Sequence, residues 1–202
     1  MLFRSLVGAG QPNLRTIIPL NYDSRHNIKM NIDYRYASGE NYTGPRVGNS
    51  DIFSNAGLNL QLSTRSGEPF SRQTVATPDA QFGVAGRSNL DGAINGSRLP
   101  WHFRADLKVD KSFYVGVGES RELGFNVYFW VQNLFNNRNI ISVYPFTGNP
   151  EDDGYLSSAV GIDNTSEELD PQSFVDLYGI KVANPSNYSL PRRMRIGISM
   201  SF

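Results

Sequence analysis

The sequence predicts an all-β protein: an antiparallel transmembrane β-barrel segment with about six long strands and two long extracellular loops, one of which carries a short helix. Three observations predict it. Apolar and polar residues alternate, the alternating runs cover about 9–13 residues, and the connections between them alternate between shorter and longer. Strands of soluble proteins average about 5–6 residues. The whole chain, residues 1–202, is expected to form this one unit.

Five segments carry the period-two alternation. In residues 26–36, Ile28, Met30 and Ile32 share one parity, and charged residues such as Lys29 occupy the other. Because successive side chains of a strand point to opposite faces, each segment has one apolar and one polar face. A truncated sixth strand is expected at residues 2–7. The four other alternating segments are residues 57–65, 101–113, 123–135 and 193–202.

The connections indicate which end of the strands carries the loops. Ser66–Leu99 and Thr147–Leu190 are long, whereas the links that alternate with them, such as residues 114–122, are shorter. In an antiparallel sheet, alternate connections lie at the same end. The two long ones therefore gather on one side, as the extracellular loops of outer-membrane barrels do.

The second long loop has local structure and charge of its own. Asp170 can cap a helix of about two turns that begins at Pro171 and ends at Gly179. Between Arg138 and Lys181 the chain has eight acidic residues and no basic one. A solvated loop is the plain interpretation; a calcium or ligand-binding loop is the alternative, since hard oxygen ligands suit Ca²⁺. The candidate ligands are Glu151, Asp152, Asp153 and Asp163.

Composition argues against several function classes. The 19 basic and 19 acidic residues balance, so no global charge favours nucleic acid, and the absence of cysteine excludes disulfides and thiolate sites. No apolar run reaches the roughly 20 residues of a membrane helix. His26 and His102 lack zinc-site spacing, and Ser24 has no triad geometry. We expect no enzyme activity, no cofactor and no metal.

The first ten residues, MLFRSLVGAG, do not read as a signal peptide, because Arg4 interrupts a short apolar run. Either the protein is cytoplasmic, or Met1 is not its true beginning. A sheet spans a bilayer only as a closed barrel, with apolar side chains toward lipid and polar ones toward a wet lumen. The alternation fits that polarity. Aromatic residues near strand ends fit interfacial girdles: Tyr34, Tyr36, Trp101, Phe103, Phe113, Tyr114 and Phe202.

Two alternatives stay open at this point. A soluble β-sandwich or carbohydrate-binding module would bury the apolar parity in a core and use its aromatic residues as sugar platforms. A small complete barrel, serving as an adhesin or structural protein, would need two further strands. Both alternatives place the alternating segments in an antiparallel sheet.

The chain resembles the C-terminal end of a TonB-dependent outer-membrane receptor, whose barrel surrounds an N-terminal plug. The resemblance rests on an ordered set of segments that covers nearly the whole chain. It implies about 22 strands in the complete receptor, of which these would be the last six, with the plug and the N-terminal strands absent here. The segments are residues 23–36, 43–70, 98–113, 123–156 and 187–202.

The C-terminus also resembles the signal by which the barrel assembly machinery recognises its substrates. Arg195, Gly197, Met200 and Phe202 occupy its places, and Met200 departs from the commoner aromatic residue. The resemblance implies location in the outer membrane of a Gram-negative bacterium and uptake of a scarce solute: a siderophore, glycan, peptide or vitamin. The implied partners are outer-membrane lipid, the assembly machinery, and TonB acting through a plug that this chain lacks.

Overall fold

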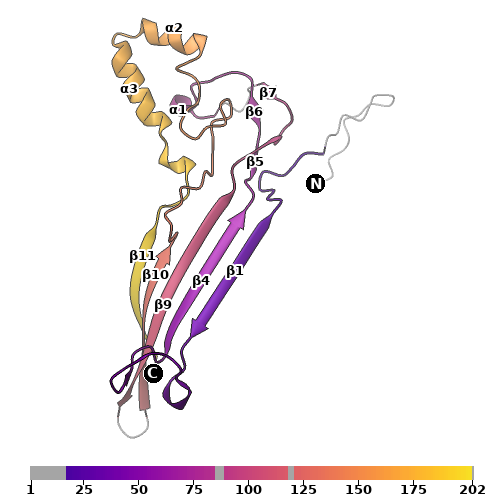
Figure 1. Cartoon of the computed structure of the whole chain (residues 1–202). Helices are drawn as coiled ribbons and strands as arrows, with labels where there is room; N and C mark the ends of the chain where they lie inside the picture. The colour runs from indigo at the N-terminus through magenta and orange to yellow at the C-terminus, as the bar shows by residue number, and fades with distance from the viewer. Residues whose placement is uncertain (1–16, 85–88, 118–120, 202) are drawn as a thin grey trace.

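The computed structural model describes residues 17–84, 89–117 and 121–201, and its main feature is one five-stranded antiparallel sheet. Each strand pairs with the next long strand along the chain (Figure 1). The five alternating segments are thereby confirmed as strands, while the sixth, at residues 2–7, lies outside the described residues. In order across the sheet, the strands are β1 (Asn27–Arg35), β4 (Ala56–Arg65), β9 (His102–Val117), β10 (Arg121–Gln132) and β11 (Arg193–Ser201).

The sheet is open. Strands β1 and β11 are its two edges and do not pair with each other, so the described strands form a wall rather than a closed barrel. Every residue of β1 and all but one of β11 are exposed, as expected for strands with a neighbour on one side only.

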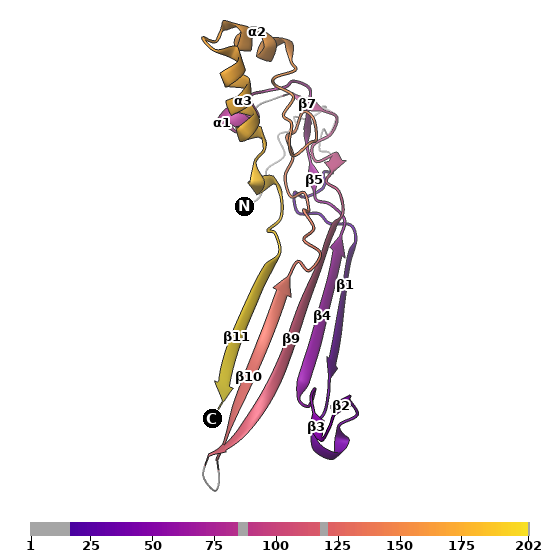
Figure 2. The same cartoon turned by 60° about the vertical axis from the view of Figure 1, so that its left-hand side comes forward.

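Both long connections lie at one end of the sheet and both short ones at the other (Figures 1 and 2). Of the described residues, the loop end carries 66–84, 89–101 and 133–192, and the turn end carries 36–55 and the ends of β9 and β10 that face one another. This arrangement confirms the alternation of connection lengths expected from the sequence.

Short elements occupy the connections. At the turn end are η1 (Gly39–Asn41) and a hairpin of β2 (Arg46–Val47) and β3 (Ser50–Asp51). At the loop end, β5 (Pro69–Phe70) pairs with β8 (Ser97–Arg98), and β6 (Arg72–Gln73) pairs with β7 (Leu90–Asp91). The helical elements there are α1 (Asp79–Phe82), α2 (Ala159–Glu167), α3 (Pro171–Val182) and η2 (Pro185–Asn187).

Several elements differ from the sequence prediction in their bounds or in their presence. β10 ends at Gln132 rather than Phe135, because Asn133 has φ +56° and turns the chain. α3 begins as predicted, with the Asp170 side chain accepting from Ser173 N at 3.1 Å, but it runs past Gly179 to Val182. α2 was not predicted, so the loop has two helices rather than one. The α2 N-cap is Ser158, which accepts from Gly161 N at 3.0 Å.

The packed core lies in the loops. α2 and α3 stand beyond the loop end of the sheet and cover neither of its faces (Figures 1 and 2). The buried hydrophobic cluster consists of Tyr144, Tyr155, Tyr178 and Val182, with Ala80, Leu156 and Phe174 packed against it.

Candidate membrane-facing surface and loop assembly

One face of the sheet is apolar across all five strands. The register aligns Ile32, Leu60, Leu107, Val131 and Met194 in one row. The next row toward the turn end holds Tyr34, Leu58, Val109, Phe129 and Ile196. We call this surface the apolar face.

The apolar face is largely uncovered. Ile28 is 61 % exposed, Ile196 77 % and Ile198 71 %, whereas core residues of a soluble sheet are mostly buried. The buried positions on this face, within the described strands, are Ala56, Ala105 and Val131. Large contiguous apolar patches are rare on soluble monomers and mark interaction or membrane sites.

Aromatic residues border the apolar face at both ends. At the loop end His26 stacks on Trp101, with ring centroids 5.8 Å apart, and Phe103 contacts Phe135. At the turn end Tyr36 contacts Tyr34 and Phe53. Phe113 is exposed there as well.

Two of the predicted girdle residues, Tyr114 and Phe202, do not lie in the described borders of the apolar face. Tyr114 belongs to the other parity, where it pairs with Gly124, so it lies on the polar face and not beside the aromatic residues that border the apolar face. Phe202 lies outside the described residues. Lys111 is a cation on the parity of the apolar face. Its ammonium group donates to the Ile52 carbonyl and lies 5.2 Å from the Phe113 ring centroid, near the turn-end aromatic border.

The opposite face, the polar face, carries a cross-strand hydrogen-bond network. Arg35 forms two hydrogen bonds to the Asp110 carboxylate, at 2.9 and 3.0 Å, and Asn126 donates to the same carboxylate at 2.9 Å. Gly57 makes room for this ion pair, since a Cβ there would lie 2.5 Å from an Arg35 nitrogen. On the edge, Asn59 donates to Asp33 at 2.9 Å. The network ties β1, β4, β9 and β10 together through side chains.

The candidate assembly-signal residues divide between the two faces of β11. Met200 pairs with Phe125 on the apolar face, whereas Arg195 and Gly197 lie on the polar face, opposite Trp130 and Tyr128. The Arg195 guanidinium lies 5.7 Å from the Trp130 ring centroid. A Cβ at Gly197 would lie 2.5 Å from the Tyr128 ring. The absence of a side chain at Gly197 therefore leaves the space that the ring occupies.

The four acidic residues proposed as a calcium or ligand site do not converge: three have separate partners and Asp163 is exposed. Glu151 accepts from Tyr188 at 2.6 Å and pairs with Arg138 at 3.4 Å. Asp152 accepts from Gly154 N at 2.7 Å, and Asp163 is exposed within α2. Within the described ranges, no group of three or more His, Asp or Glu side chains could hold a metal ion. The structure therefore gives the calcium hypothesis no support.

Asp153 instead joins the two long loops. Its side chain is 1 % exposed and accepts from Tyr178 Oη at 2.5 Å, from Tyr155 N at 3.0 Å, and from Ala80 N at 3.1 Å. Ala80 belongs to the first long loop and the other two to the second. A buried carboxylate with three donors is a stabilising arrangement, whereas an unpaired one would be costly.

Burial near Asp153 raises the pKa values of two tyrosines, Tyr178 and Tyr144. Burial, and then the hydrogen bond to Asp153, raise the pKa of Tyr178 far above its ordinary value. Burial, and then the charge of Asp153, raise the pKa of Tyr144, whose hydroxyl donates to the Val182 carbonyl at 3.1 Å. Both tyrosines are therefore neutral at physiological pH, which leaves Tyr178 able to donate its proton to Asp153.

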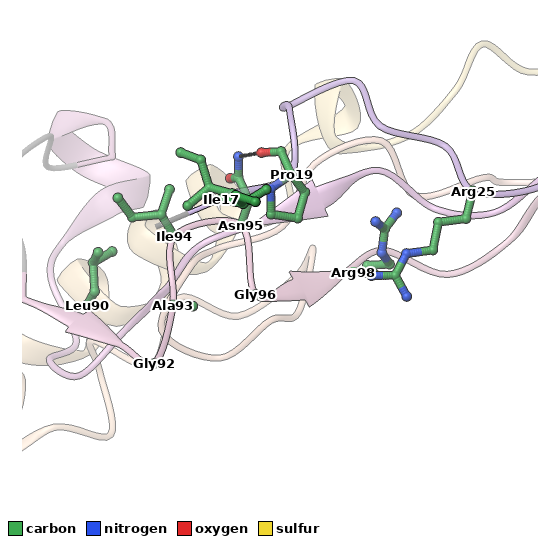
Figure 3. Close-up of a pocket in the computed structure, with 11 residues that line it drawn as sticks. Ile17, Pro19, Arg25, Leu90, Gly92, Ala93, Ile94, Asn95, Gly96 and Arg98 are labelled. Carbon is green, nitrogen blue, oxygen red and sulfur yellow. Dashed lines mark hydrogen bonds between the residues drawn. The ribbon is translucent and has the colours of Figure 1, made fainter. Parts of the chain in front are cut away.

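A hollow of about 460 Å³ lies between residues 17–25 and the β7–β8 turn (Figure 3). Asn95 joins the two sides of this hollow, because its side-chain amide donates to the Pro19 carbonyl at 2.8 Å and to the Asn21 side-chain oxygen at 2.7 Å. Arg98 is held by Asp23 and by the Gly67 carbonyl. Asp23 pairs with Arg98, and the Ser24 hydroxyl donates to the backbone carbonyls of Ser66 and His26, so these contacts are not those of a catalytic triad, which would need the His26 imidazole.

The two histidines have structural partners. His102 is buried, with Nε2 2.7 Å from the Ile140 carbonyl and Nδ1 3.2 Å from an Arg65 nitrogen. His26 stacks on Trp101. Both histidines thus have structural partners near the loop end of the sheet.

None of the described helices is long and apolar enough to cross a membrane. Comparison of the chain with protein-family models, curated proteins and solved structures finds no match in any of the three.

Proposed function

We propose that this chain forms the C-terminal wall and two capture loops of a TonB-dependent outer-membrane receptor that imports a scarce solute. The observation that carries the proposal is the apolar face, which is continuous over five strands and uncovered along its length. Burying that face in acyl chains removes it from water, while the hydrogen-bonded polar face lines an aqueous passage.

The height of the apolar face fits a bilayer. Phe103 and Phe113 lie at its two aromatic borders on β9, ten residues apart in sequence. At about 3.3 Å per residue and a tilt of about 40°, that separation corresponds to roughly 25 Å along the membrane normal. Outer-membrane barrels have an apolar band of about 25 Å between aromatic girdles.

The edges of the sheet support membership of a larger barrel. In lipid, unpaired backbone groups on β1 and β11 would each cost several kcal/mol per group, so both edges need further strands. A receptor of this family supplies them, together with a plug through which TonB acts. The barrel assembly machinery would recognise the terminal strand, β11.

The loop end is the proposed solute-binding mouth. Its two loops share one buried core and are joined through Asp153, so they present a shaped surface rather than free coils. The solute would be a siderophore, glycan, peptide or vitamin. A soluble β-sandwich or carbohydrate-binding module requires a second layer over the apolar face, and the described part of the chain provides none.

The orientation of the faces is tested by single-cysteine labelling, for which a chain without cysteine is well suited. Ile198→Cys and the adjacent Ser199→Cys would carry an environment-sensitive fluorophore in the complete receptor, whose other strands pair with both edges of this sheet, after it has folded into phosphatidylcholine vesicles. We expect lipid-borne quenchers to reach the first label and aqueous iodide the second. Equal access of iodide to both labels would refute the membrane assignment.

Transport is tested in the source organism. Deleting the gene should abolish energy-dependent growth on one member of a panel of ferric siderophores, glycans, peptides and cobalamin, and deletion of TonB should have the same effect. Unchanged growth on every member would contradict the uptake role while leaving the membrane assignment to the labelling experiment.

A further inference from the structure

A pocket of about 340 Å³ lies at the loop end of the sheet. Strands β1, β4 and β9 form its floor, and Asn139 and Ser189 contribute from the connection between β10 and β11. Its ten lining residues include three cations and no acidic residue. The three cations are Lys29, Arg65 and Arg104, and the strands also contribute Asn27, Ser63 and His102 to the lining.

The register brings the three cations together. Lys29, Ser63 and Arg104 form one row across β1, β4 and β9, and Arg65 lies in the next row, beside His102. With strands about 4.8 Å apart, Lys29 and Arg104 are roughly 10 Å apart at the backbone, and Arg65 stands on the strand between them. Such a group of like charges is unfavourable unless anions compensate it.

The protein compensates only part of this charge. Arg65 pairs with Glu68 at 2.7 Å, and Arg104 pairs with Asp106 at 2.7 Å, but both acids lie outside the pocket lining. Lys29 has no hydrogen bond or ion pair with any residue in the described ranges. One cation facing the pocket is thus left without a counter-charge.

His102 helps to fix this arrangement. An arginine nitrogen can only donate, so the contact with Arg65 makes His102 Nδ1 an acceptor and places the proton on Nε2, which donates to the Ile140 carbonyl. The buried, neutral imidazole thereby holds the Arg65 guanidinium in place beside the pocket. Nearby amide and hydroxyl groups offer further donors.

We propose that this pocket binds a solute bearing carboxylate or phosphate groups, which Lys29, Arg65 and Arg104 would contact as charge-assisted donors. This inference deepens the proposed function and rests on it, since it makes the polar face below the loops the place where an anionic solute first enters the lumen. Binding itself is measurable without transport.

The test uses the complete receptor that contains this chain, folded in detergent micelles at pH 7 and titrated with citrate or inorganic phosphate, with glucose as a neutral probe. Calorimetry gives the affinity, and amide NMR shifts locate the site. We expect citrate to shift the amides of Lys29, Ser63 and Arg104, and glucose to shift none of them.

Lys29→Gln should weaken citrate binding about tenfold, as loss of one charge-assisted contact predicts. Lys181→Gln is the matched control: it removes the same charge from α3, outside the pocket. Ser63→Asp, which places a carboxylate between the cations, should abolish binding in a folded chain. Absence of citrate binding, or an equal effect of both lysine variants, would overturn the proposal, whereas the vesicle labelling result would be unaffected.

Discussion

At the scale of single residues, Gly197 and Asp153 have contacts in the folded chain that differ from the roles their sequence patterns suggest. Gly197 matches a recognition pattern, yet in the folded sheet it also gives the Tyr128 ring its place. Asp153 belongs to an acidic run that suggests a calcium loop, yet it is buried under three donors. In each case one side chain from a distant segment decides the role.

Gly197→Ala is therefore expected to destabilise the folded chain by about 1–3 kcal/mol, because the added methyl forces the Tyr128 ring to move. Urea unfolding in micelles measures this cost, and Ser199→Ala is the control on the same face. Adding Tyr128→Ala should remove most of the glycine effect, as a double-mutant cycle would show. An undiminished cost in the double variant would mean that the glycine acts without the ring.

Tyr178→Phe should loosen the loop assembly by about 1–3 kcal/mol, since buried Asp153 then loses one donor. Hydrogen exchange of α3 amides measures the change locally. Tyr188→Phe is the control, because its partner Glu151 is exposed and the loss should be small. Equal loss of protection in both variants would show that the buried hydrogen bond to Asp153 stabilises the loops no more than the exposed one to Glu151 does.

The same contact has a pH dependence whose sign follows from the raised pKa of Tyr178. The unfolded tyrosine ionises near pH 10, whereas the folded one keeps its proton. The contribution of Tyr178 is thus complete below about pH 10 and is lost as the pH rises further. Protection of α3 amides should fall above that pH in the parent chain and fall less in Tyr178→Phe.

At the scale of elements, the strands were predictable and the loop helices less so. Strict alternation over residues 26–36 marks β1 because a two-residue period has no other simple explanation. α2 carries only Val160 and Ile162 as large apolar residues, so its helical period is too weak to read. The end of α3 was misplaced because Gly179 continues the helix instead of adopting a positive φ.

The start of α3, by contrast, follows a local rule that mutagenesis can check. Asp170→Ala removes the side-chain acceptor for Ser173 N and should cost about 1 kcal/mol. Amide exchange in the first turn of α3 is the measurement. Asp163→Ala, which removes an exposed acid from the neighbouring helix α2, should leave that first turn unchanged. A loss of protection equal in both would assign the effect to charge rather than to capping.

At the scale of the whole molecule, the proposal predicts that the two faces tolerate charge differently. Leu60→Arg places a cation near the middle of the apolar face and should cost about 2–4 kcal/mol when the complete receptor folds into phospholipid vesicles. Gln61→Arg, one residue along on the polar face, should cost little. Equal costs would contradict contact of the apolar face with lipid.

The sequence by itself determined the five strands, their two-faced character and the end at which the long loops gather, because alternation and connection length are local properties of the chain. The tertiary structure decided which side chains meet: the buried Asp153 that joins both loops, Tyr128 over Gly197, and the cations around the loop-end pocket. Those contacts join residues far apart in sequence, and strand register and loop packing bring them together only after the chain has folded.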